Sequence, residues 1–400
     1  MEKRWLLLAA VGACACSGTL RDRSAKRAPS TEVRASSEVA GSQQSAVGNP
    51  FVGATYFLNP EYTSRLEATA STHPGEALAI RKVTHFPTAV WLDTIERAKS
   101  VSSVLEAAAQ QAKGGPPALT VFVVYDLPNR DCSAKSSAGE LTSEAGGEQR
   151  YKAEFIDKIA EQFAGFPDQR IVVVLEPDSL ANLATNMNVP RCAQSDALYR
   201  RSIAYAVSKL AMPNVSLYLD AAHAGWLGWD ANRLKIARIF KDVLSLAGGA
   251  HKIRGFSTNV SNFNTLSGAE GKQLGASNPC PDELTYVAKL GESLEREGIS
   301  AKQFIIDTSR NGRAVRSSWG NWCNVKGAGL GERPKPAPGR LVDAYFWIKP
   351  PGESDGVSDP TQARFDLACT SRDSAANAPQ AGQWFESYFL DLVSNATPAL

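Results

Sequence analysis

Hydrophobic and polar positions follow one another along the chain in blocks of two kinds. Short apolar runs rich in β-branched residues recur, and each has the length of a buried parallel strand. These runs are Ala89–Leu92, Thr120–Tyr125, Ile171–Leu175, Val215–Leu219, Arg254–Thr258, Phe304–Ile306 and Ala344–Ile348. Longer stretches with helical spacing lie between several of them, at Tyr151–Phe163, Ala197–Ala211, Arg233–Leu246 and Asp282–Glu297. Strands that alternate with helices predict βα units and a parallel sheet.

The ends of the predicted strands separate two possible architectures, a doubly wound open sheet and a βα barrel. A barrel gathers its active-site residues at the C-terminal ends of many strands, whereas an open sheet gathers them at one switch point. Any single carboxylate after a strand is readily explained as a helix N-cap. Here polar groups follow all seven runs, which favours the barrel: Asp93, Asp126 with Asp131, Glu176 with Asp178, Asp220, Asn259 with Asn262, Asp307 with Arg310, and Lys349 with Asp355. No glycine-rich phosphate loop follows the first strands, so no nucleotide cofactor is expected.

The N-terminus has the layout of an export signal. Lys3 and Arg4 precede the apolar run Trp5–Val11, which is too short to remain as a membrane anchor. The segment up to Cys14 also resembles a bacterial lipoprotein processing site, so simple secretion and a lipid anchor on Cys14 at the cell surface are both open. Residues 17–48 contain few large apolar side chains and predict a disordered linker. We therefore expect a signal peptide at 1–16, a linker at 17–48 and a catalytic domain at 49–400.

Composition narrows the class of protein. A chain of 400 residues with 43% hydrophobic residues and a formal net charge of +2 is a globular protein with no sign of a nucleic-acid partner. Five cysteines follow the leader, and an oxidising compartment would allow four of them to pair. With no CxxC pair and only four histidines, a structural zinc is not expected.

Two segments carry candidate chemistry. Tyr125 to Ser133 leaves one predicted strand and places Arg130 beside Asp131, and the next predicted strand runs into Glu176-Pro177-Asp178. Either segment alone would be read as the start of a capped helix. Together they bring two carboxylates to neighbouring strand ends, where burial and like charge raise the pKa of one of them. A raised pKa is what a general acid needs at neutral pH.

With these segments the sequence resembles glycoside hydrolase family six, which contains cellobiohydrolase II and related endoglucanases. The resemblance runs from about Gly48 to the C-terminus. The residues that carry it are Tyr125, Pro128, Arg130, Asp131, Cys132, Ser133 and Gly139 in the first signature, Glu176–Leu180 in the second, and the blocks Tyr218–Trp229, Arg254–Asn264, Trp322–Cys323 and Lys349–Gly356. It implies an α/β fold: a distorted, TIM-like β/α barrel of about seven parallel strands, with the active site in a cleft or tunnel at the C-terminal strand ends.

The resemblance also implies a reaction, the inverting hydrolysis of β-1,4-glucosidic bonds in cellulose and cello-oligosaccharides. Asp178 matches the proton donor, and Asp131 matches the neighbour that keeps the proton on it. Asp355 matches the residue proposed as the base for water, a role that is less certain in this family than that of the acid. Tyr125 is expected to distort the sugar ring, and Ser137 is expected to hold the water. No metal or cofactor is expected, because two carboxyl groups and water suffice for this chemistry.

Further residues have implied roles in binding the glucan chain. Tryptophan rings stack on the flat faces of sugars, and the matched platforms are Trp226, Trp229 and Trp322. The matched polar residues, which bind sugar hydroxyls or tune the site, are Asp220, His223, Asn262, Arg310, Lys349 and Glu353. Four other tryptophans are predicted to be structural, namely Trp91, Trp319, Trp347 and Trp384. The resemblance pairs Cys132 with Cys192 and Cys323 with Cys369, and leaves Cys280 without a partner.

Three functions remain open at this stage. A cellobiohydrolase that releases cellobiose from chain ends is favoured, because both loops that would roof the cleft are long. An endo-β-1,4-glucanase of the same family would have one of those loops displaced from the cleft. A non-catalytic glucan-binding surface protein is a third reading, against which the intact Asp131, Asp178 and Asp355 argue. The expected partner is a cellulose or β-glucan chain, no protein partner is implied, and we expect a secreted monomer.

Overall fold

The computed structural model describes residues 48–268, 274 and 277–400. The predicted leader, Cys14 and the predicted linker up to residue 47 lie outside the described residues. Among the helices of the described part, none has the length and apolar character needed to cross a bilayer.

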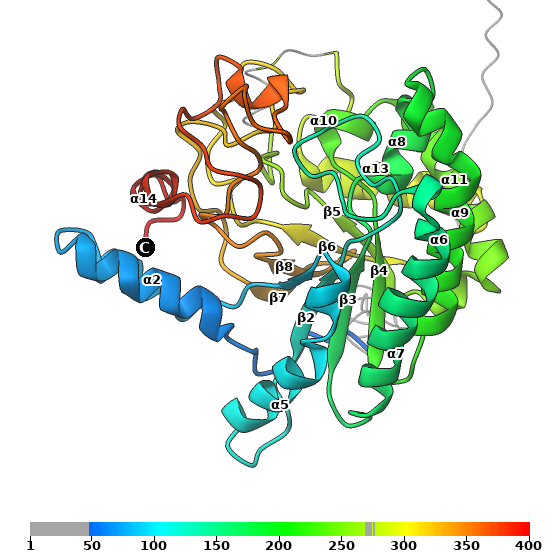
Figure 1. Cartoon of the computed structure of the whole chain (residues 1–400), viewed down its shortest axis with the longest axis horizontal. Helices are drawn as coiled ribbons and strands as arrows, with labels where there is room; N and C mark the ends of the chain where they lie inside the picture. Colours follow the sequence, from blue (N-terminus) through cyan, green and yellow to red (C-terminus); the bar gives the residue numbers. More distant parts are fainter. Residues whose placement is uncertain (1–47, 269–273, 275–276) are drawn as a thin grey trace, which may run out of the picture. The chain divides into compact units, whose positions relative to one another are not determined.

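An eight-stranded sheet forms the centre of the fold, in the order β1-β2-β3-β4-β5-β6-β8-β7 (Figure 1). Its strands are β1 Val90–Leu92, β2 Thr120–Val124, β3 Ile171–Leu175, β4 Val215–Asp220, β5 Gly255–Thr258, β6 Gln303–Asp307, β7 Lys335–Gly339 and β8 Val342–Phe346. Neighbours from β1 to β6 and on to β8 are parallel. Each of the seven apolar runs overlaps one of these parallel strands, which confirms the predicted fold class.

The two ends of the parallel sheet meet. Thr88, just before β1, forms a parallel bridge with Trp347, just after β8. The backbone N–H of Ala89 also donates to the carbonyl oxygen of Trp347 at 3.2 Å. These contacts close the sheet into a distorted barrel, and the described residues form no full ladder between β1 and β8.

Strand β7 was not predicted from the sequence. Among the described strands it pairs with β8 alone, in antiparallel orientation, and its residues are largely exposed. Pro336 and Pro338 lie within it, and proline is tolerated at such an edge because the missing N–H has no ladder to join. Strand β8 itself begins two residues before the predicted run, which started at Ala344.

Helices pack on the outer face of the sheet and over its ends. They are α2 Pro60–Thr72, α3 Ala77–Val83, α4 Ile95–Ala98, α5 Val101–Gln111, α6 Gly147–Arg150, α7 Asp157–Ala164, α8 Ser179–Thr185, α9 Pro190–Leu210, α10 Ala224–Leu227, α11 Asp230–Ala247, α13 Glu283–Arg296 and α14 Glu386–Ser394, with 3-10 turns η1 Ser143–Ala145, η3 Ala250–Lys252 and η4 Leu367–Thr370 and the π-helix η2 Tyr151–Ile156. The four predicted helical stretches coincide with these helices to within one residue at their ends or fall inside them. The first begins as the π-helix η2 and continues as α7.

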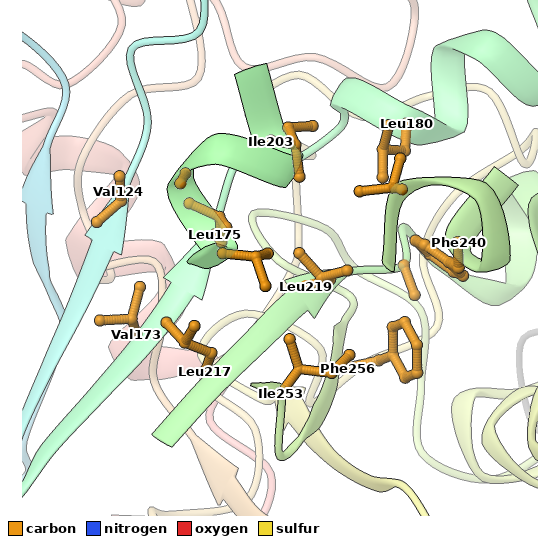
Figure 2. Packing of buried hydrophobic residues seen from close by; sticks show 14 of the residues in the cluster. Val124, Val173, Leu175, Leu180, Ile203, Leu217, Leu219, Phe240, Ile253 and Phe256 are labelled. Atoms are coloured by element: carbon orange, nitrogen blue, oxygen red, sulfur yellow. The ribbon is translucent and has the colours of Figure 1, made fainter. Parts of the chain in front are cut away.

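Two apolar layers explain why the strands read as continuous hydrophobic runs. Successive strand residues point to opposite faces, so Val121 and Val123 pack inside the barrel while Phe122 and Val124 pack outside. Figure 2 shows the outer layer, in which Leu175, Leu217 and Leu219 of the strands meet Leu180, Ile203 and Phe240 of α8, α9 and α11. A separate cluster joins α2 to α14, through residues such as Leu66 and Phe389.

Two disulfides fasten loops on the side of the barrel where the parallel strands end. One joins Cys132, after β2, to Cys192 at the start of α9, and the other joins Cys323 to Cys369 in the segment after β8. These are the pairs that the resemblance implies. Cys280 is buried and unpaired among the described cysteines, where the Nη1 of Arg233 lies 3.2 Å from its sulfur.

Candidate active site

A cavity of about 520 Å³ opens at the C-terminal ends of the parallel strands. All five residues with predicted catalytic roles line it: Tyr125, Asp131, Ser137, Asp178 and Asp355. Six of the predicted sugar-binding residues line it too: Trp226, Trp322, His223, Asn262, Lys349 and Glu353. Loops that are far apart in the sequence therefore bring the two signatures and the later blocks to one place.

The turn after β3 presents Asp178 to the cavity. Asp178 has a left-handed backbone with φ of 62°, and Glu176 before it has φ of 49°. Such conformations are costly for residues other than glycine and occur mostly at functional sites. The N–H of Asp178 donates to the Oδ2 of Asp220 at 3.0 Å, and its carbonyl oxygen accepts from the Nδ2 of Asn182 at 2.9 Å. Contacts to β4 and to α8 thus hold the strained turn.

The electrostatic surroundings of Asp178 suit a proton donor. Burial is the largest cause that raises the pKa of its carboxyl well above the usual value, and the negative charges of Asp220, Asp131 and Asp355 raise it further. No cationic side chain is among the causes of the shift. Burial and like charge therefore favour the protonated form of Asp178, which is the form that a proton donor needs.

Asp131 lies beside Asp178 in a different environment. Burial raises its pKa, but hydrogen bonds from Tyr125 and Ser137 and the charge of Arg130 oppose that shift. The hydroxyl of Tyr125 donates to Oδ2 of Asp131, and the guanidinium of Arg130 lies 4.4 Å from the centre of the Tyr125 ring. Two carboxyl groups in one pocket thus have neighbours that separate their protonation, which is the usual arrangement for acid and base chemistry.

Arg130 links this pair to the neighbouring loops. Its Nε donates to the carbonyl oxygen of Ser137 at 2.8 Å, and its Nη1 donates to the carbonyl oxygen of Asp93 at 2.8 Å. A Cβ at Gly139 would lie 2.9 Å from Nε of Arg130. The glycine of the first signature therefore makes room for the guanidinium.

Two hydrogen bonds fix the side chain of Asp355. Its Oδ2 accepts from Nη1 of Arg310 and from the backbone N–H of Asn324, both at 2.8 Å. Arg310 is fully buried and is not part of the cavity lining, and neither is Asp220, which holds the Asp178 turn. Arg310 and Asp220 therefore contact the Asp355 side chain and the Asp178 turn from outside the cavity lining.

The aromatic lining differs from the sequence prediction at three tryptophans. Trp91 and Trp319 line the cavity, although both were predicted to be structural, while Trp229 at the start of α11 is not part of the lining. Trp91 lies edge-on to the Tyr125 ring at 5.5 Å. Its place two residues before Asp93 at a strand end was a signal that could have located it. Trp226 is part of the lining, and its Nε1 donates to Oγ1 of Thr185 at 2.7 Å.

Polar residues without any sequence assignment complete the lining. Asn182, Asn186 and Arg364 are among them. Asn182 lies on α8, one turn after Asp178, and its Oδ1 accepts from the hydroxyl of Ser133 at 2.6 Å. Its helical spacing from Asp178 was the available signal, whereas nothing near Arg364 in the sequence marks it.

A buried carboxyl behind the site makes stability depend on pH. Burial raises the pKa of Asp126 from 3.8 to about 8, against the opposing charge of Arg130. Because the folded state holds this proton more tightly than the unfolded chain, the stability that it contributes is complete below about pH 4 and is lost as the pH rises towards 8. We predict that the free energy of unfolding falls between pH 5 and 8, and that Asp126→Asn reduces the fall by about 1 kcal/mol or more.

Urea unfolding at pH 5, 6.5 and 8 measures this dependence. The control is Asp168→Asn, an exposed carboxyl in the turn before β3, which should leave the wild-type slope unchanged. Equal slopes for wild type and Asp126→Asn would contradict the prediction.

A parallel barrel that gathers buried carboxyl groups and tryptophan rings in one cavity at its C-terminal face has the site of a glycosidase. Comparison with known proteins identifies the family. The family model described as "Glycosyl hydrolases family 6" matches residues 51–396, and the chain belongs to this family.

Relatives with names and structures agree with this assignment. Exoglucanase 3 of Agaricus bisporus is 42% identical over 360 residues, covering 89% of this chain and 81% of its own. A putative endoglucanase type B of Fusarium oxysporum is 40% identical over 359 residues, covering 88% and 78%. The structure of cellobiohydrolase II from Humicola insolens in complex with glucose and cellotetraose is 40% identical, covers 88% of this chain and 100% of its own, and superposes with a TM-score of 0.84.

Proposed function

We propose that this protein is a cellobiohydrolase, which hydrolyses β-1,4-glucosidic bonds in cellulose and cello-oligosaccharides with inversion and releases cellobiose. The observation that carries the proposal is the raised pKa of Asp178 in a cavity that also contains Asp131 and Asp355. The complex of the Humicola insolens cellobiohydrolase with cellotetraose supports a cello-oligosaccharide as the ligand of this protein.

The proposed mechanism divides the work between the carboxyl groups. Asp178 gives its proton to the glycosidic oxygen as the C–O bond breaks, and Asp355 removes a proton from the water that attacks the opposite face of the sugar. Arg310 and Asn324 both bind Oδ2 of Asp355, so Oδ1 remains for the water. The negative charge of Asp131 helps to retain the proton on Asp178 until the leaving group takes it.

Exo action is favoured because two loops meet over the cavity. One is the loop after β2 that contains Ser136, and the other is the segment after β8 that contains Arg364. Nε of Arg364 donates to the carbonyl oxygen of Ser136 at 2.8 Å, and Oδ2 of Asp366 accepts from the N–H of Lys135 at 2.9 Å. The approach is close: a Cβ at Gly356 would lie 2.6 Å from the Cβ of Ser136. Both disulfides anchor these loops, through Cys132 and Cys369. A cavity covered by loops admits a glucan chain from its end. This supports a cellobiohydrolase over an endoglucanase, the activity named for one of the relatives.

Product analysis tests both parts of the proposal. Wild-type protein should release cellobiose from cello-oligosaccharides with the α-anomer first in NMR spectra, and it should lower the viscosity of carboxymethylcellulose slowly relative to the reducing ends formed. Asp366→Ala removes the contact with Lys135 that joins these two loops. Asp366 is not in the cavity lining, so the residues that contact the sugar stay in place. We expect a several-fold larger loss of viscosity per reducing end in this variant.

Asp359→Ala is the matched control, since the described donors to its carboxylate are Thr361 and Gln362 of the same segment. It should behave as wild type. A rapid viscosity drop by the wild type would favour the endoglucanase, and β-anomer product would overturn inversion.

We also propose an extracellular location, supported by the leader in the sequence and by the two disulfides, which form in oxidising compartments. A lipid anchor on Cys14 and the monomeric state remain predictions from the sequence.

A further inference from the structure

A buried carboxylate with no assigned role lies directly behind the catalytic pair. Glu176 is 1% exposed and is absent from the cavity lining. Its Oε1 accepts from the N–H of Asp126 at 3.3 Å and from the hydroxyl of Tyr151 at 2.8 Å. Its Oε2 accepts from the N–H of Leu127 at 3.2 Å. Three donors therefore converge on one side chain that is not part of the cavity lining.

These hydrogen bonds take the place of the backbone ladder at the point where β2 and β3 separate. The ladder between β2 and β3 ends at the pair Val124 and Leu175, and the N–H of Glu176 still donates to the carbonyl oxygen of Val124 at 2.8 Å. Beyond this point the two chains diverge, and the buried N–H groups of Asp126 and Leu127 need an acceptor. The Glu176 carboxylate supplies it.

The position of Glu176 in the sequence connects it to the chemistry. Asp178 follows two residues after Glu176 in the same strained turn. Asp131 lies in the turn after β2, a few residues beyond Asp126 and Leu127, whose N–H groups Glu176 binds. A single side chain thus joins the two turns that carry the acid and its partner. Displacing it would change the position of one carboxyl group relative to the other.

Tyr151 holds this carboxylate from the other side. It is fully buried and is the first residue of the π-helix η2, which continues the short helix α6 and leads into α7. π-Helical turns are rare, and they are retained mostly at functional sites. The ring of Tyr151 packs on Phe155 with centres 5.7 Å apart, so its hydroxyl is held on Glu176 by packing as well as by the hydrogen bond.

We propose that Glu176 is a positioning residue, held by Tyr151, that sets the place of Asp178 relative to Asp131. This inference rests on the proposed function, in which Asp178 is the proton donor. It concerns protonation of the leaving group more than the binding of the sugar, because neither Glu176 nor Tyr151 belongs to the cavity lining.

The test compares two substrates in Tyr151→Phe and Glu176→Gln. Cellotetraose has a leaving group that needs the proton of Asp178, whereas 2,4-dinitrophenyl β-cellotrioside has one that leaves without it. A misplacement of about 1 Å can cost up to about 100-fold in rate. We expect kcat on cellotetraose to fall about tenfold or more, with KM almost unchanged, and kcat on the dinitrophenyl substrate to fall much less.

Tyr218→Phe is the matched control. Tyr218 is equally buried and its hydroxyl donates to the carboxylate of Asp343 at 2.6 Å, outside the cavity lining. This variant also loses one buried tyrosine–carboxylate hydrogen bond, so it should lose stability in a thermal melt while keeping kcat on both substrates.

Two outcomes would overturn the inference: an unchanged kcat in folded Tyr151→Phe and Glu176→Gln, or equal losses on the two substrates. Asp178→Ala distinguishes this failure from that of the proposed function. If Asp178→Ala itself loses activity equally on both substrates, the assignment of the proton donor is wrong. If it discriminates between them and the Tyr151 and Glu176 variants do not, only the positioning role is wrong.

Discussion

Replacing Asp178 with alanine is expected to lower kcat on cellotetraose by about 10²–10⁴-fold, the range that a general acid contributes. The variant removes the group whose pKa burial and three neighbouring carboxylates raise. Since the donor works in its protonated form, wild-type kcat should fall as the pH rises through this raised pKa. The alkaline limb of the pH profile should be absent from Asp178→Ala.

Steady-state kinetics from pH 4 to 9 on cellotetraose measure both effects. The dinitrophenyl substrate serves as the internal control, because its leaving group needs little protonation and should be hydrolysed with a much smaller loss. An active Asp178→Ala enzyme with the wild-type alkaline limb would assign the proton donor to another group, with Asp131 as the first candidate.

Replacing Asp355 with alanine is expected to lower kcat by about 100-fold or more, because the attacking water then has no base. Azide is a nucleophile that carries no proton to remove, and it fits the space that the side chain leaves. Added azide should restore turnover by forming a carbon–nitrogen bond as the glycosidic bond breaks, and with inversion the product is an α-glycosyl azide. NMR of the product identifies it.

Stability needs a separate control in this experiment. Arg310 is 0% exposed and bonds to Asp355, and a buried charge left without its partner costs about 3–5 kcal/mol. Asp355→Asn keeps an acceptor for Arg310 and should lose activity with less loss of melting temperature. Loss of activity with no azide rescue in a folded variant would place the base elsewhere, and near wild-type activity would exclude Asp355 from the role.

Much of the barrel was predictable because of where its strands lie. Strands buried on both faces consist of nearly continuous apolar residues, as Val121 to Val124 illustrate, so the local pattern alone identifies them. Strand β7 and helices α2 and α14 were not predicted. The first is an exposed edge containing prolines, and the two helices are stabilised by packing in a cluster that unites the two ends of the described chain.

The site was predictable to the extent that its chemistry follows strand ends. Asp131 and Asp178 come after adjacent strands, so parallel pairing brings them together. Whether a side chain lines the cavity or lies beneath it depends on the turn that carries it, so the sequence did not reveal that Arg310 lies outside the cavity lining. The place of Trp91 in the cavity lining was not predicted, because a tryptophan in a strand can either pack in the core or line a cavity.

By itself, therefore, the sequence determined the βα barrel, the family and the carboxyl groups that line the cavity, since each depends on local pattern or on residue identity. Only the tertiary structure decided which loops roof the cavity, which tryptophans line it and how Glu176 joins the turns of Asp131 and Asp178. These features depend on contacts between segments far apart in the chain, such as Arg364 with Ser136 and Glu176 with Tyr151. No local pattern encodes such contacts, because they form only when the closed sheet brings those segments together.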